Sequence, residues 1–358
     1  GAVDLVTLYI GLETMAIATY VLVGFLRGHQ RSNEASMKYF LLGAFSSGIL
    51  LYGMSLLYGV SGSTRFTDIA DALSRRPMND PISMMAMITL SAGIFFKIAA
   101  VPFHQWTPDA YEGAPTSITA YMSVAVKAAS FAMMVRIFMI AIYPLRPQWI
   151  AILTAVSIMT MTVGNIAAIT QSNVKRLLAY SSISHAGYIL IGFIAGNDMG
   201  LTAVALYLLI YTFTNIGAWA VIVALRRKDI IGEHIDEMSG LYFKNPVAAL
   251  LMLIFLLSLA GIPPTAGFIG KYYLFAAAIQ TGHNTLAVIA VLNAAISIYF
   301  YLRIVVAMFM REATEKTGLT YSPGLITALG VAFIFTMLIG IYPDPFIAMA
   351  RQAAAVGF

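Results

Sequence analysis

The sequence predicts an all-α protein that crosses a membrane about ten times, and three observations lead to this fold class. Hydrophobic residues make up 60% of the chain and charged residues only 10%, and the mean hydropathy is +0.83. No soluble domain of 358 residues has enough interior to hide that much apolar surface. The apolar runs are long and continuous rather than alternating, which excludes a porin-type barrel.

Ten apolar segments are long enough to cross a bilayer, and we expect them to form one integral domain over residues 1–358. They are Val3–Leu26, Ala35–Val60, Pro81–Ala100 with a continuation to Gly113, Pro115–Ile142, Gln148–Thr170, Val174–Ala195, Gly200–Leu225, Pro246–Thr281, Asn284–Met310 and Tyr321–Ile341. The sizeable loops between them are Ser61–Asp80 and Arg226–Asn245.

Two of these segments are predicted to be broken helices. Pro102 interrupts IFFKIAAVPFHQWTPDAYEGAP, and Pro263 and Pro264 interrupt SLAGIPPTAGFIGKYY within a segment that would reach about 54 Å as unbroken helix, against a hydrocarbon core of about 30 Å. Inside a bilayer such a break persists only where protein or a water-lined cavity satisfies the freed backbone groups. The broken segments are third and eighth in order, so they cross in opposite directions, which is typical of inverted repeats.

Basic residues predict the orientation of the chain in the membrane. The ends of odd-numbered segments carry Arg27, Arg31, Lys38, Lys175, Arg176, Arg226, Arg227, Lys228, Lys244, Arg311 and Lys316. The opposite side carries Arg65, Arg75, Arg76, Arg146 and Arg351. Because cytoplasmic loops are enriched in Lys and Arg, we expect the first set in the cytoplasm and both ends of this chain outside.

Four ionisable residues fall near the middle of predicted spans: Glu13, Lys97, Lys127 and Lys271. A charge at that depth costs about 2.5–3.5 kcal/mol, so such residues need a reason to be there. Structural ion pairing is one reading, but three cations cannot all pair with a single carboxylate.

The other reading is a proton relay, which we favour. Burial makes an amine give up its proton more readily, whereas a nearby carboxylate makes the amine hold it. Moving Glu13 toward or away from Lys97 would therefore switch Lys97 between holding and releasing a proton, with Lys127 receiving it and Lys271 passing it on.

Several neighbouring residues are weaker candidates. For His185, in AYSSISHAGY, the unperturbed pKa of histidine suits a relay between lysines, and the alternative is a neutral histidine bonded to a neighbouring helix. His104 is expected to cap the break at Pro102, and Asp109 and Glu112 are expected at the membrane interface rather than in catalysis.

Other chemistries find little support in the sequence. The chain has no Cys, which excludes disulfides and iron–sulfur or haem–thiolate ligation by this chain. Its five His residues place no two suitable ligands on one helix, so no metal site is predicted. No glycine-rich phosphate loop follows a strand, and the net charge of +5 is explained by basic loops rather than by nucleic-acid binding.

At this point the sequence resembles a known family. FFKIAAVPFHQWTPDAYEGAP, NVKRLLAYSSISHAGY and LAGIPPTAGFIGKYYLF resemble the antiporter-like membrane subunits of respiratory complex I, the proton-pumping NADH:quinone oxidoreductase. YEGAP and the early RSNEASMKYFLLGA resemble the subunit N branch in particular. The likeness covers essentially the whole chain. Family members have fourteen helices, so we expect this chain to correspond to the last ten, with the opening helices missing.

The resemblance implies roles for individual residues. By motif, the proton path of the family falls on Glu13 in GLETM, Lys97 in FFKIAAVP, Lys127 in SVAVKAASF and Lys271 in GFIGKYY. His185 matches a residue of the central polar axis of such subunits. A Lys at the last position fits subunits N and L, and the absence of a long amphipathic helix after Ile341 argues against subunit L.

The resemblance also implies a function: proton translocation in a bacterial cytoplasmic membrane, driven by quinone reduction elsewhere in the complex. It places NADH, FMN, iron–sulfur clusters and quinone in other subunits, with no cofactor in this chain, and makes the neighbouring membrane subunits and lipid its partners. The nearest alternative is a subunit of a multi-subunit cation/proton antiporter or membrane-bound hydrogenase. A small-molecule carrier and a purely structural scaffold are further alternatives.

Overall fold

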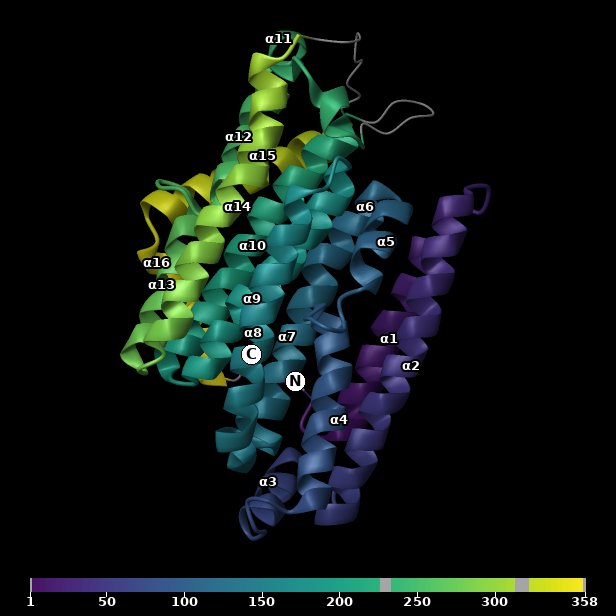
Figure 1. Cartoon of the computed structure of the whole chain (residues 1–358), viewed down its shortest axis with the longest axis vertical. Coiled ribbons are helices and arrows are strands. Elements are labelled where there is room, and N and C mark those ends of the chain that lie inside the picture. The colour runs from purple at the N-terminus through teal and green to yellow at the C-terminus, as the bar shows by residue number, and fades with distance from the viewer. Residues whose placement is uncertain (1, 226–232, 313–321, 357–358) are drawn as a thin grey trace.

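The computed structural model describes residues 2–225, 233–312 and 322–356 as a bundle of helices (Figure 1). Nine helical stretches in this part are long and apolar enough to cross a membrane. They are Leu5–Val23 (α1), Gln30–Ser61 (α2), Pro81–Ile98 (α4), Thr116–Ala141, Tyr143–Ile169, Val174–Ala195 (α9), Asp198–Ala224 (α10), Asn284–Met310 (α14) and Pro323–Ile341 (α15). The remaining predicted span consists of two half-helices, Pro246–Ala260 (α12) and Ala266–Gln280 (α13). The predicted fold class is confirmed.

Two of these stretches are composite. Thr116–Ala141 joins α6 (Thr116–Tyr121), a π-helical turn (Met122–Val126), α7 (Lys127–Arg136) and a second π-helical turn, and Tyr143–Ile169 joins a 3-10 turn to α8 (Arg146–Ile169).

Four cations used for orientation and the first residue of the last predicted span lie outside the described residues: Arg226, Arg227, Lys228, Lys316 and Tyr321.

The structure adds helices that the sequence interpretation treated as loops or ends. α3 (Phe66–Ser74) lies in the first long loop and buries Phe66, Ile69 and Leu73, which share one helical face. α16 (Asp344–Val356) follows α15 and packs against α10, and the short α11 (Leu241–Lys244) precedes α12.

α9 forms the centre of the bundle. Every residue of α9 except Arg176 and Tyr180 is buried, because α8, α10, α13 and α5 (Trp106–Gly113) pack around it. α1, α2 and α4 lie on one side of this centre and α13, α14 and α16 on the other (Figure 1). α2 packs against both halves of the first broken span, α4 and α5, and α10 packs against both halves of the second. This repetition is the predicted pair of inverted repeats.

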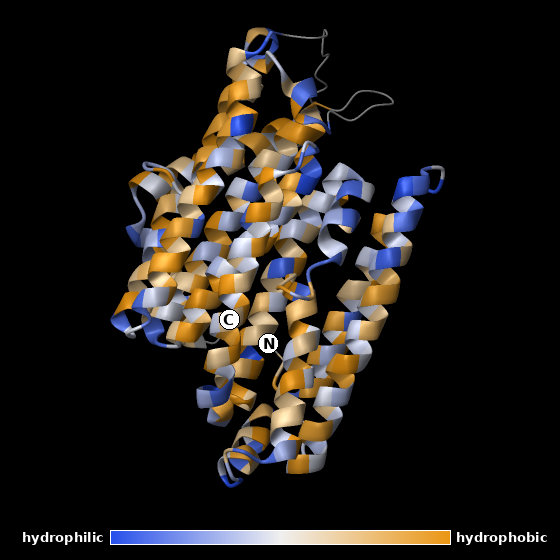
Figure 2. Ribbon diagram, viewed as in Figure 1, coloured by the Kyte–Doolittle hydropathy of each residue, from blue (hydrophilic) through white to orange (hydrophobic). Residues whose placement is uncertain are grey.

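The outer surface of the bundle is apolar. Large hydrophobic side chains of α1 such as Val6, Ile10 and Ile17 are exposed, as are Ile326 and Ile334 of α15. Hydrophobic colour follows the outer helices along their length, and hydrophilic colour gathers at the loops at both ends (Figure 2). Such a band of exposed apolar side chains is the surface that a protein presents to lipid.

At the second break, the backbone of Gly267 lies in close contact with Ser258. The Gly267 N–H donates to Ser258 Oγ over 3.0 Å, and a Cβ at Gly267 would lie only 1.7 Å from the Ser258 carbonyl oxygen. Because backbone cannot yield as a flexible side chain does, Gly267→Ala should destabilise the fold by about 1–3 kcal/mol or more. Thermal unfolding of the purified protein in detergent measures this as a lower Tm.

Gly59→Ala is the matched control, since a Cβ at Gly59 meets no atom within 4 Å and alanine favours helix. A Gly267→Ala protein as stable as Gly59→Ala would contradict the described geometry of the break.

Candidate functional site

Lys97 of the first broken span forms an ion pair with Glu13 of α1, and both residues were predicted. Lys97 Nζ lies 3.6 Å from Glu13 Oε1, and it is also 3.3 Å from Ser47 Oγ and 3.5 Å from Tyr20 Oη. The Ser47 hydroxyl donates to the same Glu13 oxygen. The Lys97 side chain is 3% exposed and that of Glu13 is 21% exposed. The structure therefore brings together the carboxylate and the amine that sequence reasoning paired.

The break beside Lys97 is satisfied without the lysine. α4 ends at Ala99, which has a left-handed φ of 60°. The Trp106 indole N–H donates to the Phe96 carbonyl over 3.0 Å, and the Val101 N–H donates to Thr160 Oγ1 over 3.0 Å. The Trp106 indole therefore caps the end of α4. Nδ1 of His104 has no hydrogen-bond partner among the described residues, and the capping role expected for His104 stays a prediction. Lys97 is thus free to pair with Glu13.

Lys127 begins α7, directly after the π-helical turn Met122–Val126. Its ammonium donates to the Ser182 carbonyl over 2.5 Å and to the Ser182 hydroxyl over 2.6 Å, and lies 6.0 Å from the centre of the Tyr211 ring. Within the described ranges, no carboxylate pairs with this buried cation. π-helical turns are frequently found at functional sites, where they redirect a side chain.

His185 lies in the middle of α9 between two tyrosines. Nδ1 is 2.6 Å from the Tyr207 hydroxyl, and Nε2 is 3.1 Å from the Tyr301 hydroxyl. The Tyr301 hydroxyl is in turn 2.5 Å from Ser181 Oγ. Each of these hydroxyls can donate or accept, so the chain from Ser181 to Tyr207 can transmit a proton in either direction.

Lys271 satisfies the second break itself. α12 ends at Gly261, which has a φ of 85°, and the ammonium of Lys271 donates to the Leu259 and Ala260 carbonyls over 3.1 and 2.7 Å. The C-terminus of a helix carries partial negative charge, which favours a cation there. No carboxylate pairs with Lys271 in the described part of the chain, and the Tyr188 ring centre is 5.0 Å away. The two breaks are therefore chemically different.

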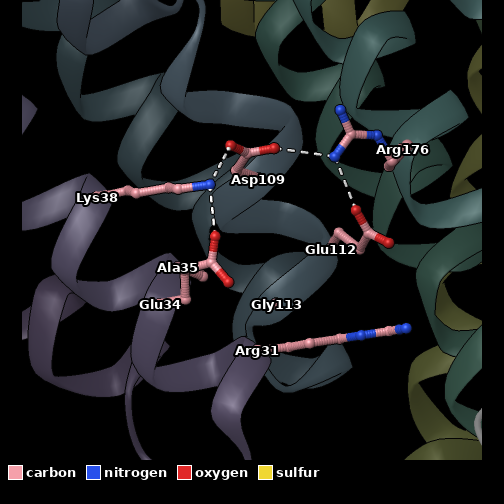
Figure 3. A pocket seen from close by; sticks show the side chains of 8 residues that line it. All are labelled: Arg31, Glu34, Ala35, Lys38, Asp109, Glu112, Gly113 and Arg176. Atoms are coloured by element: carbon pink, nitrogen blue, oxygen red, sulfur yellow. Dashed lines mark hydrogen bonds and ion pairs between the residues drawn. The ribbon is translucent and has the colours of Figure 1, made fainter.

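A charged pocket lies where α2, α5 and α9 meet, with a volume of about 260 Å³ (Figure 3). Asp109 pairs with Lys38 at 3.2 Å and with Arg176 at 2.9 Å, and Arg176 also reaches Glu112 at 2.8 Å. Two cations from other helices thus compensate the charge of the Asp109 carboxylate. We call these four residues the α5 anchor.

The α5 anchor is extended by Lys175, which is completely buried. Its ammonium donates to the Glu112 and Ala114 carbonyls over 2.7 and 2.8 Å, at the C-terminus of α5, and lies 3.6 Å from Glu233. Asp109 and Glu112, expected at the interface, thus hold the second half of the first broken span against α2 and α9.

Sequence reasoning missed the hydroxyl partners of the predicted relay residues. Tyr20, Ser47, Tyr207 and Tyr301 reach it from helices distant in the sequence, and no local motif identifies them. Helical spacing does place Tyr207 and Tyr211 on one face of α10. Among the described residues, no group of three or more His, Asp or Glu side chains could hold a metal ion.

Residues 2–297 match the family model described as NADH:quinone oxidoreductase/Mrp antiporter, TM. The chain is 58% identical to NADH-quinone oxidoreductase subunit N 2 of Solibacter usitatus, over 98% of this chain and 71% of that protein.

Two solved structures are similar to this chain over most of its length. A chain of respiratory complex I from Thermus thermophilus aligns with a TM-score of 0.82 and 35% identity, over 95% of this chain and 74% of that one. A chain of the Mrp complex from Dietzia sp. aligns with a TM-score of 0.86 but only 24% identity, over 98% and 74%, which shows the shared fold alone. This chain therefore belongs to the family of membrane subunits of NADH:quinone oxidoreductases and Mrp antiporters, and within it to the subunit N branch.

Proposed function

We propose that this chain is a proton-translocating subunit of an NADH:quinone oxidoreductase, and that protons move along Glu13, Lys97, Lys127, His185 and Lys271. The proposal rests on the pairing of buried Lys97 with the partly buried Glu13, together with two further buried ammonium groups that have no acidic partner among the described residues. Burying uncompensated charge in a membrane is costly, and such residues mark proton and ion paths.

The Lys97–Glu13 pair would act as a switch. While Glu13 is near, its carboxylate stabilises the charged form of Lys97. If Glu13 moved away, Lys97 would keep only the hydroxyls of Ser47 and Tyr20, and its proton would be released more readily. A small displacement of α1 relative to α4 is enough to change this distance.

Beyond the switch, α9 connects the remaining groups. Lys127 donates to Ser182, and the preceding residue, Ser181, contacts Tyr301, which contacts His185. Lys127 and Lys271 are held by neutral oxygens rather than by carboxylates, so each amine can lose its proton without leaving a buried anion behind.

Electron transfer would occur outside this chain. We propose that NADH, FMN, iron–sulfur clusters and quinone are bound by other subunits, and that quinone reduction reaches this chain as a conformational or electrostatic signal. We propose that the chain lies in a bacterial cytoplasmic membrane, which the bacterial relatives named subunit N support. The distribution of Lys and Arg supports an orientation with both ends of this chain on the outer side.

A subunit of a cation/proton antiporter is the second candidate, because the Mrp complex chain shares the fold with a TM-score of 0.86. The much higher identity to relatives named subunit N favours the oxidoreductase. Purification of the tagged native complex decides between them. We expect co-purification with an NADH-oxidising arm that contains flavin and iron–sulfur clusters. A membrane assembly without such an arm that exchanges cations for protons would support the antiporter.

The switch is tested by substitutions that remove one partner of the pair. In the assembled complex in proteoliposomes, Lys97→Ala or Glu13→Ala should lower NADH-driven proton pumping by roughly tenfold or more, because a proton-transfer group is lost. The proton-to-electron ratio is measured alongside NADH oxidation. Arg75→Gln, which changes an exposed cation outside the relay, should pump normally. A normal proton-to-electron ratio in the Lys97→Ala complex would refute the relay role.

Lys271→Arg separates proton transfer from structural capping. Arginine keeps the positive charge that the Leu259 and Ala260 carbonyls need, but it does not release a proton. We expect an assembled and thermally stable complex with strongly reduced pumping, and the same result for Lys127→Arg. Lys271→Met, which removes both the proton and the cap, should reduce pumping and lower the Tm. Full pumping by Lys271→Arg would mean that Lys271 serves only to cap the break.

A further inference from the structure

Each buried lysine of the proposed relay lies near the ring of a tyrosine. The pairs, with the distance from Nζ to the ring centre, are Lys97 with Tyr20 at 6.0 Å, Lys127 with Tyr211 at 6.0 Å and Lys271 with Tyr188 at 5.0 Å. The face of an aromatic ring carries partial negative charge, so it attracts a cation within about 6 Å of its centre. Lys271 has the shortest of these three distances.

Lys271 depends on its ring more than Lys97 does. The Glu13 carboxylate lies 3.6 Å from the ammonium of Lys97, whereas no carboxylate pairs with Lys271 in the described ranges. An ammonium has three N–H donors, and hydrogen bonds to two carbonyls at the end of α12 use two of those of Lys271. The face of the Tyr188 ring supplies further partial negative charge, and burial strengthens its attraction for the cation.

The Tyr188 ring is held in place by neighbouring helices. Tyr188 is completely buried on α9, and its hydroxyl accepts a hydrogen bond from Nδ2 of Asn165 on α8 over 3.4 Å. Asn165 is itself held by Asn293 of α14, since Nδ2 also donates to the carbonyl oxygen and to Oδ1 of Asn293 over 3.0 and 3.2 Å. The Phe275 ring of α13 and the His185 ring lie 6.2 and 6.0 Å from the Tyr188 ring, between centres. These contacts keep the ring beside the ammonium of Lys271.

We propose that Tyr188 is a positioning residue for proton transfer by Lys271: the face of its ring stabilises the charged ammonium, as the Glu13 carboxylate does for Lys97. A ring attracts a cation without carrying a net charge of its own. Lys271 therefore takes up a proton more readily than it would beside an aliphatic side chain, and its release leaves no buried anion. This role rests on the proposed function.

Fluorinated phenylalanines at position 188 test the electrostatic part of this contact. Fluorine withdraws electron density from the ring face and leaves the shape of the ring almost unchanged. In the assembled complex in proteoliposomes, Tyr188→Phe should pump at close to the normal rate, because the ring is kept. Phenylalanines with one, two and three ring fluorines should then slow NADH-driven proton pumping step by step, reaching roughly threefold to tenfold with three.

Phe193 provides the matched control. It is completely buried on the same helix, and its ring packs against that of Phe131, with 6.0 Å between the centres. The same fluorinated phenylalanines at position 193 should leave pumping unchanged. Tyr188→Leu, which removes the ring, should slow pumping at least as much as three fluorines do. The Tm of each complex is measured alongside, so that a loss of assembly is recognised.

Pumping that does not depend on the number of fluorines at position 188 would overturn the role, even if the Tyr188→Leu complex failed to assemble. Equal slowing by fluorines at position 193 would also overturn it, because fluorine would then act through packing. The proposed function fails instead where Lys97→Ala pumps normally, so the two failures are distinguishable.

Discussion

The structure depends on one constraint: backbone groups freed by a helix break inside a membrane must be satisfied by the protein. The two breaks meet this constraint with different chemistry. At the first, a neutral indole, that of Trp106, binds the carbonyl of Phe96, and at the second the ammonium of Lys271 binds the last carbonyls of α12. Because the indole serves the first break, Lys97 is free to pair with Glu13, whereas Lys271 has no carboxylate partner in the described part of the chain.

Because of this difference, the two halves of the bundle have different roles in the proposed proton path. The first half contains a charge pair whose separation a small helix movement changes. The second half contains an ammonium whose position is fixed by the end of a half-helix. α9 joins them, because Ser181, Ser182 and His185 face the groups of both halves from a helix that is buried almost throughout. The α5 anchor adds a fixed reference, since Arg176 and Lys175 of α9 hold the half-helix that follows the first break.

Much of the fold could be predicted from the sequence, because long apolar runs and the proline and glycine breaks are local signals. The half-helices α12 and α13 follow from Gly261, Pro263 and Pro264, and the bounds of α9 and α14 agree with the predicted segments. α3 was missed because its apolar face has only three residues, and the whole loop is too polar to be read as a span.

The candidate site was predictable only in part. Charged residues in apolar runs stand out, so Glu13, Lys97, Lys127 and Lys271 could be found, and Lys97 and Glu13 do meet. Their partners are hydroxyls and backbone carbonyls contributed by other helices, and packing rather than local pattern decides which of them point inward. Trp106 illustrates this limit: it lies within the predicted motif, but its capping role depends on how α5 folds back toward the end of α4.

We propose that the buried lysines exchange protons during turnover. Infrared difference spectroscopy on the assembled complex, with lysine labelled at its side-chain nitrogen with nitrogen-15, measures this most directly. We expect ammonium bands that disappear and return during NADH oxidation. These bands should be missing when Lys97, Lys127 and Lys271 are all replaced by Arg. Identical difference spectra from the two complexes would contradict it.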